Sequence, residues 1–139
     1  MNLDADIALA QRLADAARLA ILPHFRSGGG AERKDDATPV TLADRAAEEA
    51  MRRLLKAEAP RDGVHGEEFG VSAGSSGRTW VLDPIDGTAG FLAGRPLFGT
   101  LIALVVEDWP VLGVIDQPVL KERWLGATGR ATTLNGAAV

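Results

Sequence analysis

Near the start of the chain, apolar residues recur at spacings of three and four, which is the pattern of an amphipathic helix. Residues 3–25 are rich in Ala, Leu and Arg, all of which favour helix. Pro23 weakens the last turn, and the Ser-Gly-Gly-Gly run at 27–30 ends the helix. We expect a packing helix without chemistry of its own, whose apolar face consists of Leu3, Ile7, Ala10, Ala14, Ala17 and Ile21.

A second helix is predicted over residues 41–59, where one apolar face consists of Ala43, Ala47, Ala50 and Leu54. Thr41 followed by Asp44 three residues later is a helix-start signal, with Thr41 as the cap. Asp44 therefore has a structural explanation as an acid of the first turn. The polar, glycine-rich segment 28–40 between the two helices predicts a surface loop, and it contains Lys34.

Beyond the second helix, the helical spacing gives way to short apolar runs of strand length. Trp80 to Leu82 indicate a short buried strand, and the run 100–106 is apolar on both faces, as in a central strand. Short turns join the later strands, so we expect neighbouring strands to be antiparallel. The fold class is therefore α+β, with two N-terminal helices packed on a mainly antiparallel sheet. The remaining strands are predicted at 111–115, at 122–126 and near 132–134.

Two connecting segments of this part of the chain carry no predicted function. Residues 71–77 contain three serines and two glycines and predict a flexible link. Asp116-Gln117-Pro118 predicts a turn rather than a site. We place Trp124, in the strand that follows, on a face of the sheet.

The chain has 139 residues, which is the size of one domain. Its formal net charge of -4 argues against nucleic acid or an anionic membrane as a partner. The absence of cysteine excludes disulfides and thiolate metal sites, which leaves oxygen ligands and two histidines, His24 and His65. No apolar run has the length of a membrane span, and acids stand where a signal peptide is basic, so we expect a cytoplasmic protein.

The residues that follow the buried strand carry the candidate chemistry. Pro84 and Gly87 favour a sharp turn, which would bring the carboxylates of Asp83 and Asp86 together at its rim. Two anions held so close repel each other unless a cation lies between them. Mg²⁺ takes oxygen ligands, commonly one or two carboxylates together with phosphate oxygens. The backbone N–H groups of Gly87 and Thr88 would then hold a phosphate.

Asp-Pro and Asp-Gly pairs are also ordinary turn chemistry, and a single match of this kind is more often a solvated loop. A second acidic element, Gly66-Glu67-Glu68, lies just upstream. Together with the Asp-Pro-Ile-Asp-Gly-Thr run at 83–88, it resembles the signature of the inositol monophosphatase superfamily, whose members are Mg²⁺-dependent phosphomonoesterases. Residues 40–44, Val-Thr-Leu-Ala-Asp, resemble a third segment of that family.

The resemblance implies a role for each site residue. It implies that Glu67, with Thr88 held by Asp44, orients the attacking water and takes its proton. As a metal ligand, Glu67 is favoured, and Glu68 is the lesser candidate. The implied metal ligands are Glu67, Asp83, Asp86 and the main-chain carbonyl of Ile85. The implied substrate contacts are Asp86, Gly87, Thr88 and Lys34, the last on a loop that leans over the metal site in the family.

Segments 95–104, 113–118 and 122–124 look like the bacterial histidinol-phosphatase branch, which removes phosphate from L-histidinol phosphate in histidine biosynthesis. Inositol 1-phosphate and nucleotide bisphosphates stay open as substrates, because they share the metal motif. An alternative from another class is a non-catalytic module that folds, dimerises through its sheet and helices, and binds the metal weakly. Phosphate release with and without Mg²⁺ separates these readings.

The resemblance covers the whole chain, yet the family continues into a second α/β domain with a Trp-Asp segment that has no match here. We therefore expect residues 1–139 to be the N-terminal metal-binding domain, with the C-terminal domain absent, in a truncated product or a natural fragment. The partner that the resemblance implies is a small phosphorylated metabolite, and a homodimer stays open.

Overall fold

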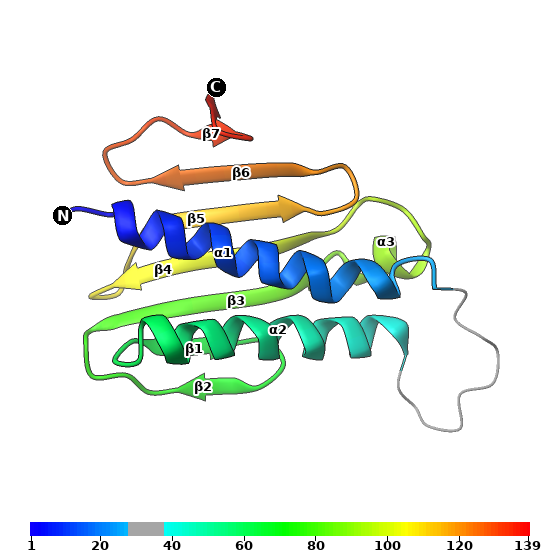
Figure 1. Ribbon diagram of the computed structural model, residues 1–139, viewed down its shortest axis with the longest axis horizontal. Coiled ribbons are helices and arrows are strands. Elements are labelled where there is room, and N and C mark those ends of the chain that lie inside the picture. Colours follow the sequence, from blue (N-terminus) through cyan, green and yellow to red (C-terminus); the bar gives the residue numbers. More distant parts are fainter. Residues whose placement is uncertain (28–37) are drawn as a thin grey trace.

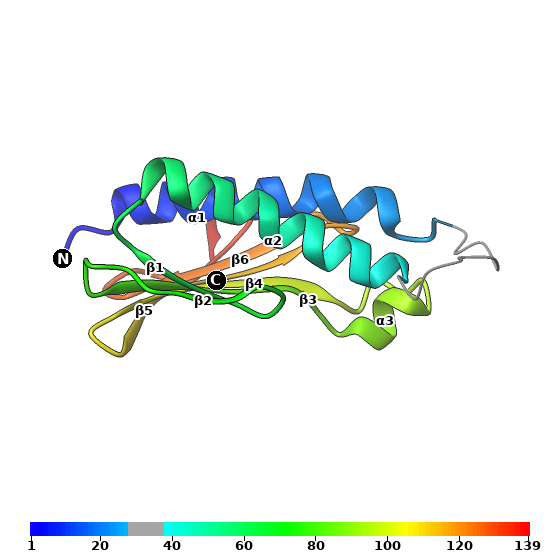
Figure 2. The ribbon, with the colours of Figure 1, turned by 90° about the horizontal axis from the view of Figure 1, so that it is seen from below.

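The computed structural model describes residues 1–27 and 38–139, and this part of the chain forms two layers (Figure 1, Figure 2). Two long helices, α1 (Asp4–Ile21) and α2 (Pro39–Glu58), lie side by side on one face of a sheet. A 3-10 turn, η1 (Leu22–His24), follows α1, and a short helix, α3 (Thr88–Leu92), lies at one end of the sheet. The predicted α+β class and the two N-terminal helices are confirmed.

The described residues form one eight-stranded sheet, in the order β2-β1-β3-β4-β5-β6-β7-β8. Neighbouring strands are antiparallel except β1 and β3, which run parallel. The predicted mainly antiparallel sheet is confirmed, and the parallel pair is the exception that matters for the site. The strands are β1 (Gly63–Gly66), β2 (Gly70–Ser72), β3 (Arg78–Asp86), β4 (Gly99–Val106), β5 (Trp109–Gln117), β6 (Glu122–Ala127), β7 (Thr133–Leu134) and β8 (Ala137–Ala138).

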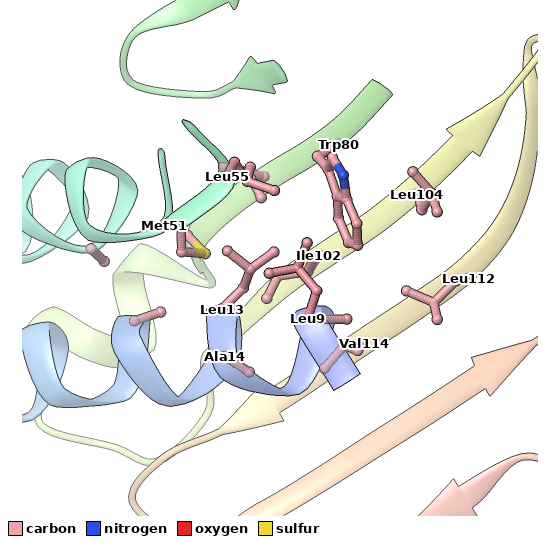
Figure 3. Close-up of a cluster of buried hydrophobic side chains, with 14 of the residues drawn as sticks. Leu9, Leu13, Ala14, Met51, Leu55, Trp80, Ile102, Leu104, Leu112 and Val114 are labelled. Atoms are coloured by element: carbon pink, nitrogen blue, oxygen red, sulfur yellow. The ribbon is translucent and has the colours of Figure 1, made fainter. Parts of the chain in front are cut away.

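The core lies between the helices and the sheet, as Figure 3 shows for the side chains that meet there. Alternate residues of each strand point to the helices, so Trp80 and Ile102 are buried against them. From the helices, Leu13 and Met51 fill the same layer and are fully buried. The indole N–H of Trp80 donates to Asp62 at 2.9 Å, which satisfies its one polar group. The predicted apolar face of the first helix is confirmed.

The cap of helix α2 lies three residues before the predicted one. Thr38 is the cap, because its hydroxyl accepts the N–H of Thr41 at 3.2 Å, and Pro39 occupies the first helical position, where its fixed φ fits. The prediction of Thr41 as the cap is therefore wrong, since it left out the Thr-Pro pair just before it. The segment 28–37, which contains Lys34, lies outside the described residues.

Two predicted connections are wrong. Residues 116–118 were expected to turn, but β5 continues to Gln117, and Asp116 is fully buried where its carboxylate accepts from Arg18 and Arg123 at 2.6 and 2.8 Å. Residues 71–77 were expected to be a flexible link. Their first residues instead belong to β2, and the next turn is held by two serine N–H groups that donate to the carbonyl of Arg61.

The other face of the sheet carries an apolar hollow of about 600 Å³. Trp124 lines it and is 39% exposed, so its predicted place on a sheet face is confirmed. The hollow reaches Asp83 at the end of β3, which joins this face to the candidate site. Among the described helices, none is long and apolar enough to cross a membrane.

Candidate functional site

The parallel pairing of β1 and β3 brings the two acidic motifs together. Gly66 is paired with Leu82, and the N–H of Glu67 donates to the Leu82 carbonyl at 3.1 Å. Glu67, the first residue after β1, and Asp83, within β3, therefore lie next to each other, although 16 positions separate them in the chain. The pKa of Asp83 is raised, first by burial, then by the charge of Asp86 and then by the charge of Glu67. The charges of Glu67 and Asp83 are therefore close enough to repel each other.

The end of β3 is irregular between Asp83 and Asp86, and the two acids differ in burial. Asp83 is paired with Leu101 and Asp86 with Gly99, so one extra residue of β3 is accommodated as a bulge. Pro84 suits a bulge, because it has no N–H to donate to the ladder, and its carbonyl accepts from the buried hydroxyl of Thr100 at 2.8 Å. Asp83 stays half-buried, whereas Asp86 is exposed at the rim. The prediction that the strand stops before Asp83 is wrong, since the strand runs through this bulge.

The turn after Asp86 requires its glycine. Gly87 has a φ of 88°, which is left-handed, and a Cβ there would lie 2.7 Å from the carbonyl oxygen of Leu97. Gly87 caps α3, whose first residue, Thr88, is exposed next to the acids. This turn matches the predicted break in the chain. The role of its two N–H groups towards a phosphate stays a prediction.

Asp44 reaches the same region from the helix layer. It lies in the second turn of α2, at the end of the sheet where Figure 1 shows α3, and it is only 7% exposed. The pKa of Asp44 is raised to about 7, first by burial and then by the charges of Glu68 and Asp83, with a backbone hydrogen bond at Ile85 opposing the rise. The expected bond of Asp44 to Thr88 stays a prediction.

Glu48 is a buried acid next to this site that sequence reasoning missed. Its side chain is fully buried and accepts the N–H groups of Glu68 and Phe69, each at 2.8 Å. Arg52, one turn further along α2, donates to the same carboxylate at 2.9 Å. The pKa of Glu68 is raised by burial first and then by the charge of Glu48. The spacing Asp44, Glu48, Arg52 on one helix face is the signal that could have found it.

The donor set fits a hard divalent cation in its chemistry. The acids supply only oxygen atoms, and those with raised pKa values repel one another, which a bound cation would relieve. Within residues 1–27 and 38–139, however, no three acidic or histidine side chains are already gathered closely enough to hold a metal ion. Glu67 and Asp86 are exposed, so both side chains can rotate towards Asp83 without repacking the core.

Comparison with known proteins gives the family. The model of the family described as "Inositol monophosphatase family" matches residues 2–139. The bifunctional phosphatase IMPL2, chloroplastic, of Arabidopsis thaliana is 49% identical over 97% of this chain and 40% of its own length. The histidinol-phosphatase of Streptomyces coelicolor is 46% identical over 92% of this chain and 52% of its own length.

The fold agrees with that result. A solved inositol monophosphatase from Zymomonas mobilis superposes with a TM-score of 0.88 at 49% identity, over 100% of this chain and 53% of the other. The chain thus spans about half the length of the relatives it matches. With its sequence matched from residue 2 to residue 139, the chain belongs to the inositol monophosphatase family.

Proposed function

We propose that this chain is the cation-binding part of a Mg²⁺-dependent phosphomonoesterase that hydrolyses a small phosphate monoester. The observation that carries the proposal is the meeting of acids from two motifs: Glu67, directly after β1, lies beside Asp83 of the parallel strand β3. Their surroundings raise the pKa of Asp83 through burial and like charge, which is a setting that favours a divalent cation. Membership of a family that contains phosphatases supports the same chemistry.

In this proposal the cation is held by oxygen atoms at the ends of the two parallel strands: Glu67, Asp83, Asp86 and the main-chain carbonyl of Ile85. When bound, Mg²⁺ would supply Lewis acidity to the phosphate group and to the attacking water. The expected place of Lys34, over the site, falls in the segment that the structure does not describe.

The protein's own groups would accept the proton and orient the attacking water and the phosphate. Glu67 accepts a proton from the attacking water while the water oxygen forms its bond to phosphorus. Thr88, positioned by Asp44, orients that water, and the N–H groups of Gly87 and Thr88 hold phosphate oxygens. The bond from phosphorus to the alcohol oxygen of the substrate breaks, and the alkoxide takes a proton from solvent water as it leaves. No covalent phosphoenzyme is formed.

Histidinol phosphate is the substrate that we favour, because a histidinol-phosphatase is 46% identical over most of this chain. Inositol 1-phosphate is the second candidate, because the solved inositol monophosphatase is 49% identical and superposes with a TM-score of 0.88. The chain spans about half of either protein, so the part of each relative that has no counterpart here can carry the groups that choose between these substrates.

The test is phosphate release from L-histidinol phosphate and from myo-inositol 1-phosphate, each at the same concentration and each with and without Mg²⁺. We expect turnover that depends on Mg²⁺, that is faster with histidinol phosphate, and that disappears in Glu67→Gln. Turnover that persists in EDTA would contradict the metal-assisted chemistry. The absence of turnover on both substrates, with Mg²⁺ still bound, would favour the non-catalytic module.

A further inference from the structure

The turn that carries Glu67 and Glu68 is held by α2 rather than by the sheet alone. The N–H of Glu67 makes the last bond to β3, and the next two N–H groups, of Glu68 and Phe69, turn away from the sheet. Both donate to the carboxylate of Glu48 at 2.8 Å, one to each oxygen. Three consecutive amides of this turn are therefore fixed, one by the strand and two by a single buried side chain.

The carboxylate that receives these bonds is itself locked in place. Arg52 donates its Nε to Glu48 at 2.9 Å and balances the buried charge. The other nitrogens of Arg52 donate to the Ser72 hydroxyl at 3.1 Å and to the Gly70 carbonyl, so the same arginine also holds β2. Arg45, one turn before Glu48, lies over the ring of Phe69 at 5.6 Å.

The Glu48 carboxylate lies so close to β1 that Gly66 has no room for a side chain. A Cβ at Gly66 would lie 2.3 Å from the carboxylate atoms of Glu48, so the acid rests directly on the strand residue that precedes Glu67. The position of the Glu48 carboxylate and the direction in which the turn leaves β1 are consequently coupled. A change in one moves the other.

We propose that Glu48 is a positioning residue for the reaction: by accepting the amides of Glu68 and Phe69, it fixes the direction in which the backbone leaves β1 at Glu67, and so the point from which the Glu67 side chain reaches towards Asp83. This inference rests on the proposed function, in which Glu67 and Asp83 share a cation. Glu48 itself touches neither substrate nor cation in this account. Groups that hydrogen-bond a metal ligand directly typically change metal affinity about 10- to 100-fold when they are replaced. Glu48 acts on Glu67 through the backbone of the turn, so we expect an effect at the lower end of that range.

The test variant is Glu48→Gln, which keeps the shape of the side chain but offers one acceptor oxygen to two donors. The matched control is Asp116→Asn, which neutralises another fully buried carboxylate with arginine partners, on β5, three strands across the sheet from β1. Two quantities are measured in both variants: the hydrogen-exchange rates of the Glu68 and Phe69 amides relative to the core amides, and the affinity for Mg²⁺ alone by calorimetry. If Glu48→Gln does not fold, Glu48→Asp takes its place.

We expect Glu48→Gln to accelerate exchange at both amides about tenfold beyond any change in the core, and to weaken Mg²⁺ binding by about tenfold or more. Asp116→Asn should leave both quantities as in the wild type. The proposal would be overturned if exchange at the two amides changed only as much as exchange in the core. An unchanged Mg²⁺ affinity in the folded variant would overturn it as well. If the wild type itself takes up no Mg²⁺, the proposed function fails and the positioning role fails with it, whereas accelerated exchange would still show that Glu48 holds the turn.

Discussion

Asp44→Asn is expected to stabilise the protein at alkaline pH in the absence of divalent cations. Asp44 is 7% exposed, and its pKa is raised from 3.8 to about 7 by burial and by neighbouring acids. Asparagine keeps the size of the side chain and can still accept the backbone hydrogen bond at Ile85. The substitution therefore removes a charge that is unfavourable in the folded state and removes little else.

The direction and the magnitude of the expected change in unfolding free energy follow from the shifted pKa of Asp44. Between pH 3.8 and about 7 the folded protein keeps a proton on Asp44 that the unfolded chain has released. The stabilisation from that proton is complete below the lower value and is lost as the pH rises through the upper one. A shift of this size corresponds to roughly 4 kcal/mol in total, of which roughly 3 kcal/mol is lost between about pH 5 and pH 8.

The assay is urea unfolding in EDTA, followed by the fluorescence of the buried Trp80. The gain in unfolding free energy of Asp44→Asn over the wild type should be larger at pH 8 than at pH 5 by roughly 3 kcal/mol. Asp116→Asn is the control, because it weakens a buried carboxylate whose arginine partners are retained, and it should destabilise at both pH values. The reasoning would be refuted if the unfolding free energies of Asp44→Asn and the wild type differed by the same amount at pH 5 and pH 8.

Two further predictions concern packing. Gly66→Ala should cost about 2 kcal/mol of unfolding free energy, because the new methyl group meets the buried carboxylate of Glu48, whereas Gly113→Ala, with open space at its Cβ, should cost less than half as much. Equal losses in the two variants, measured by urea unfolding, would argue against the tight contact. Gly87→Ala should cost about 1–2 kcal/mol from its left-handed backbone alone, measured in the same way, and a neutral result would contradict that turn.

The helices and most strands could be predicted because their signals are local. The apolar spacing of α1 depends only on residues within a few turns of one another, and the run at 100–106 is long enough to mark β4. The cap of α2 was misplaced by three residues, since both Thr38 and Thr41 offer a hydroxyl and only the Pro39 that follows Thr38 decides between them.

The errors at Asp116 and Glu48 have a different origin, because their partners are distant in the chain. Asp116 reads as part of a turn until Arg18, 98 residues away, is seen to bond it. Glu48 reads as a solvated helix residue until the amides at 68 and 69 are seen on its oxygens. Hydrophobic periodicity carries no information on either contact.

The acids of the candidate site could be named from their motifs, but their meeting could not be worked out from spacing. It depends on β1 lying parallel to β3 with Gly66 opposite Leu82, in a sheet whose other neighbouring strands, among the described residues, are antiparallel. The hydrogen bonds by which Glu48 holds the turn after Glu67 could not be predicted from the sequence either, because they join residues 20 and 21 positions apart. The motifs name the acids, and the topology of the sheet places Glu67 beside Asp83.

The central claim is that Glu67, Asp83 and Asp86 share one divalent cation, and calorimetric titration with Mg²⁺ tests it most directly. We expect the wild-type chain to take up Mg²⁺, Asp83→Asn to lose that uptake while staying folded, and Asp108→Asn, which changes an exposed acid in the turn between β4 and β5, to bind as the wild type does. The account would be contradicted if the wild type took up no Mg²⁺, or if Asp83→Asn bound it as tightly as the wild type.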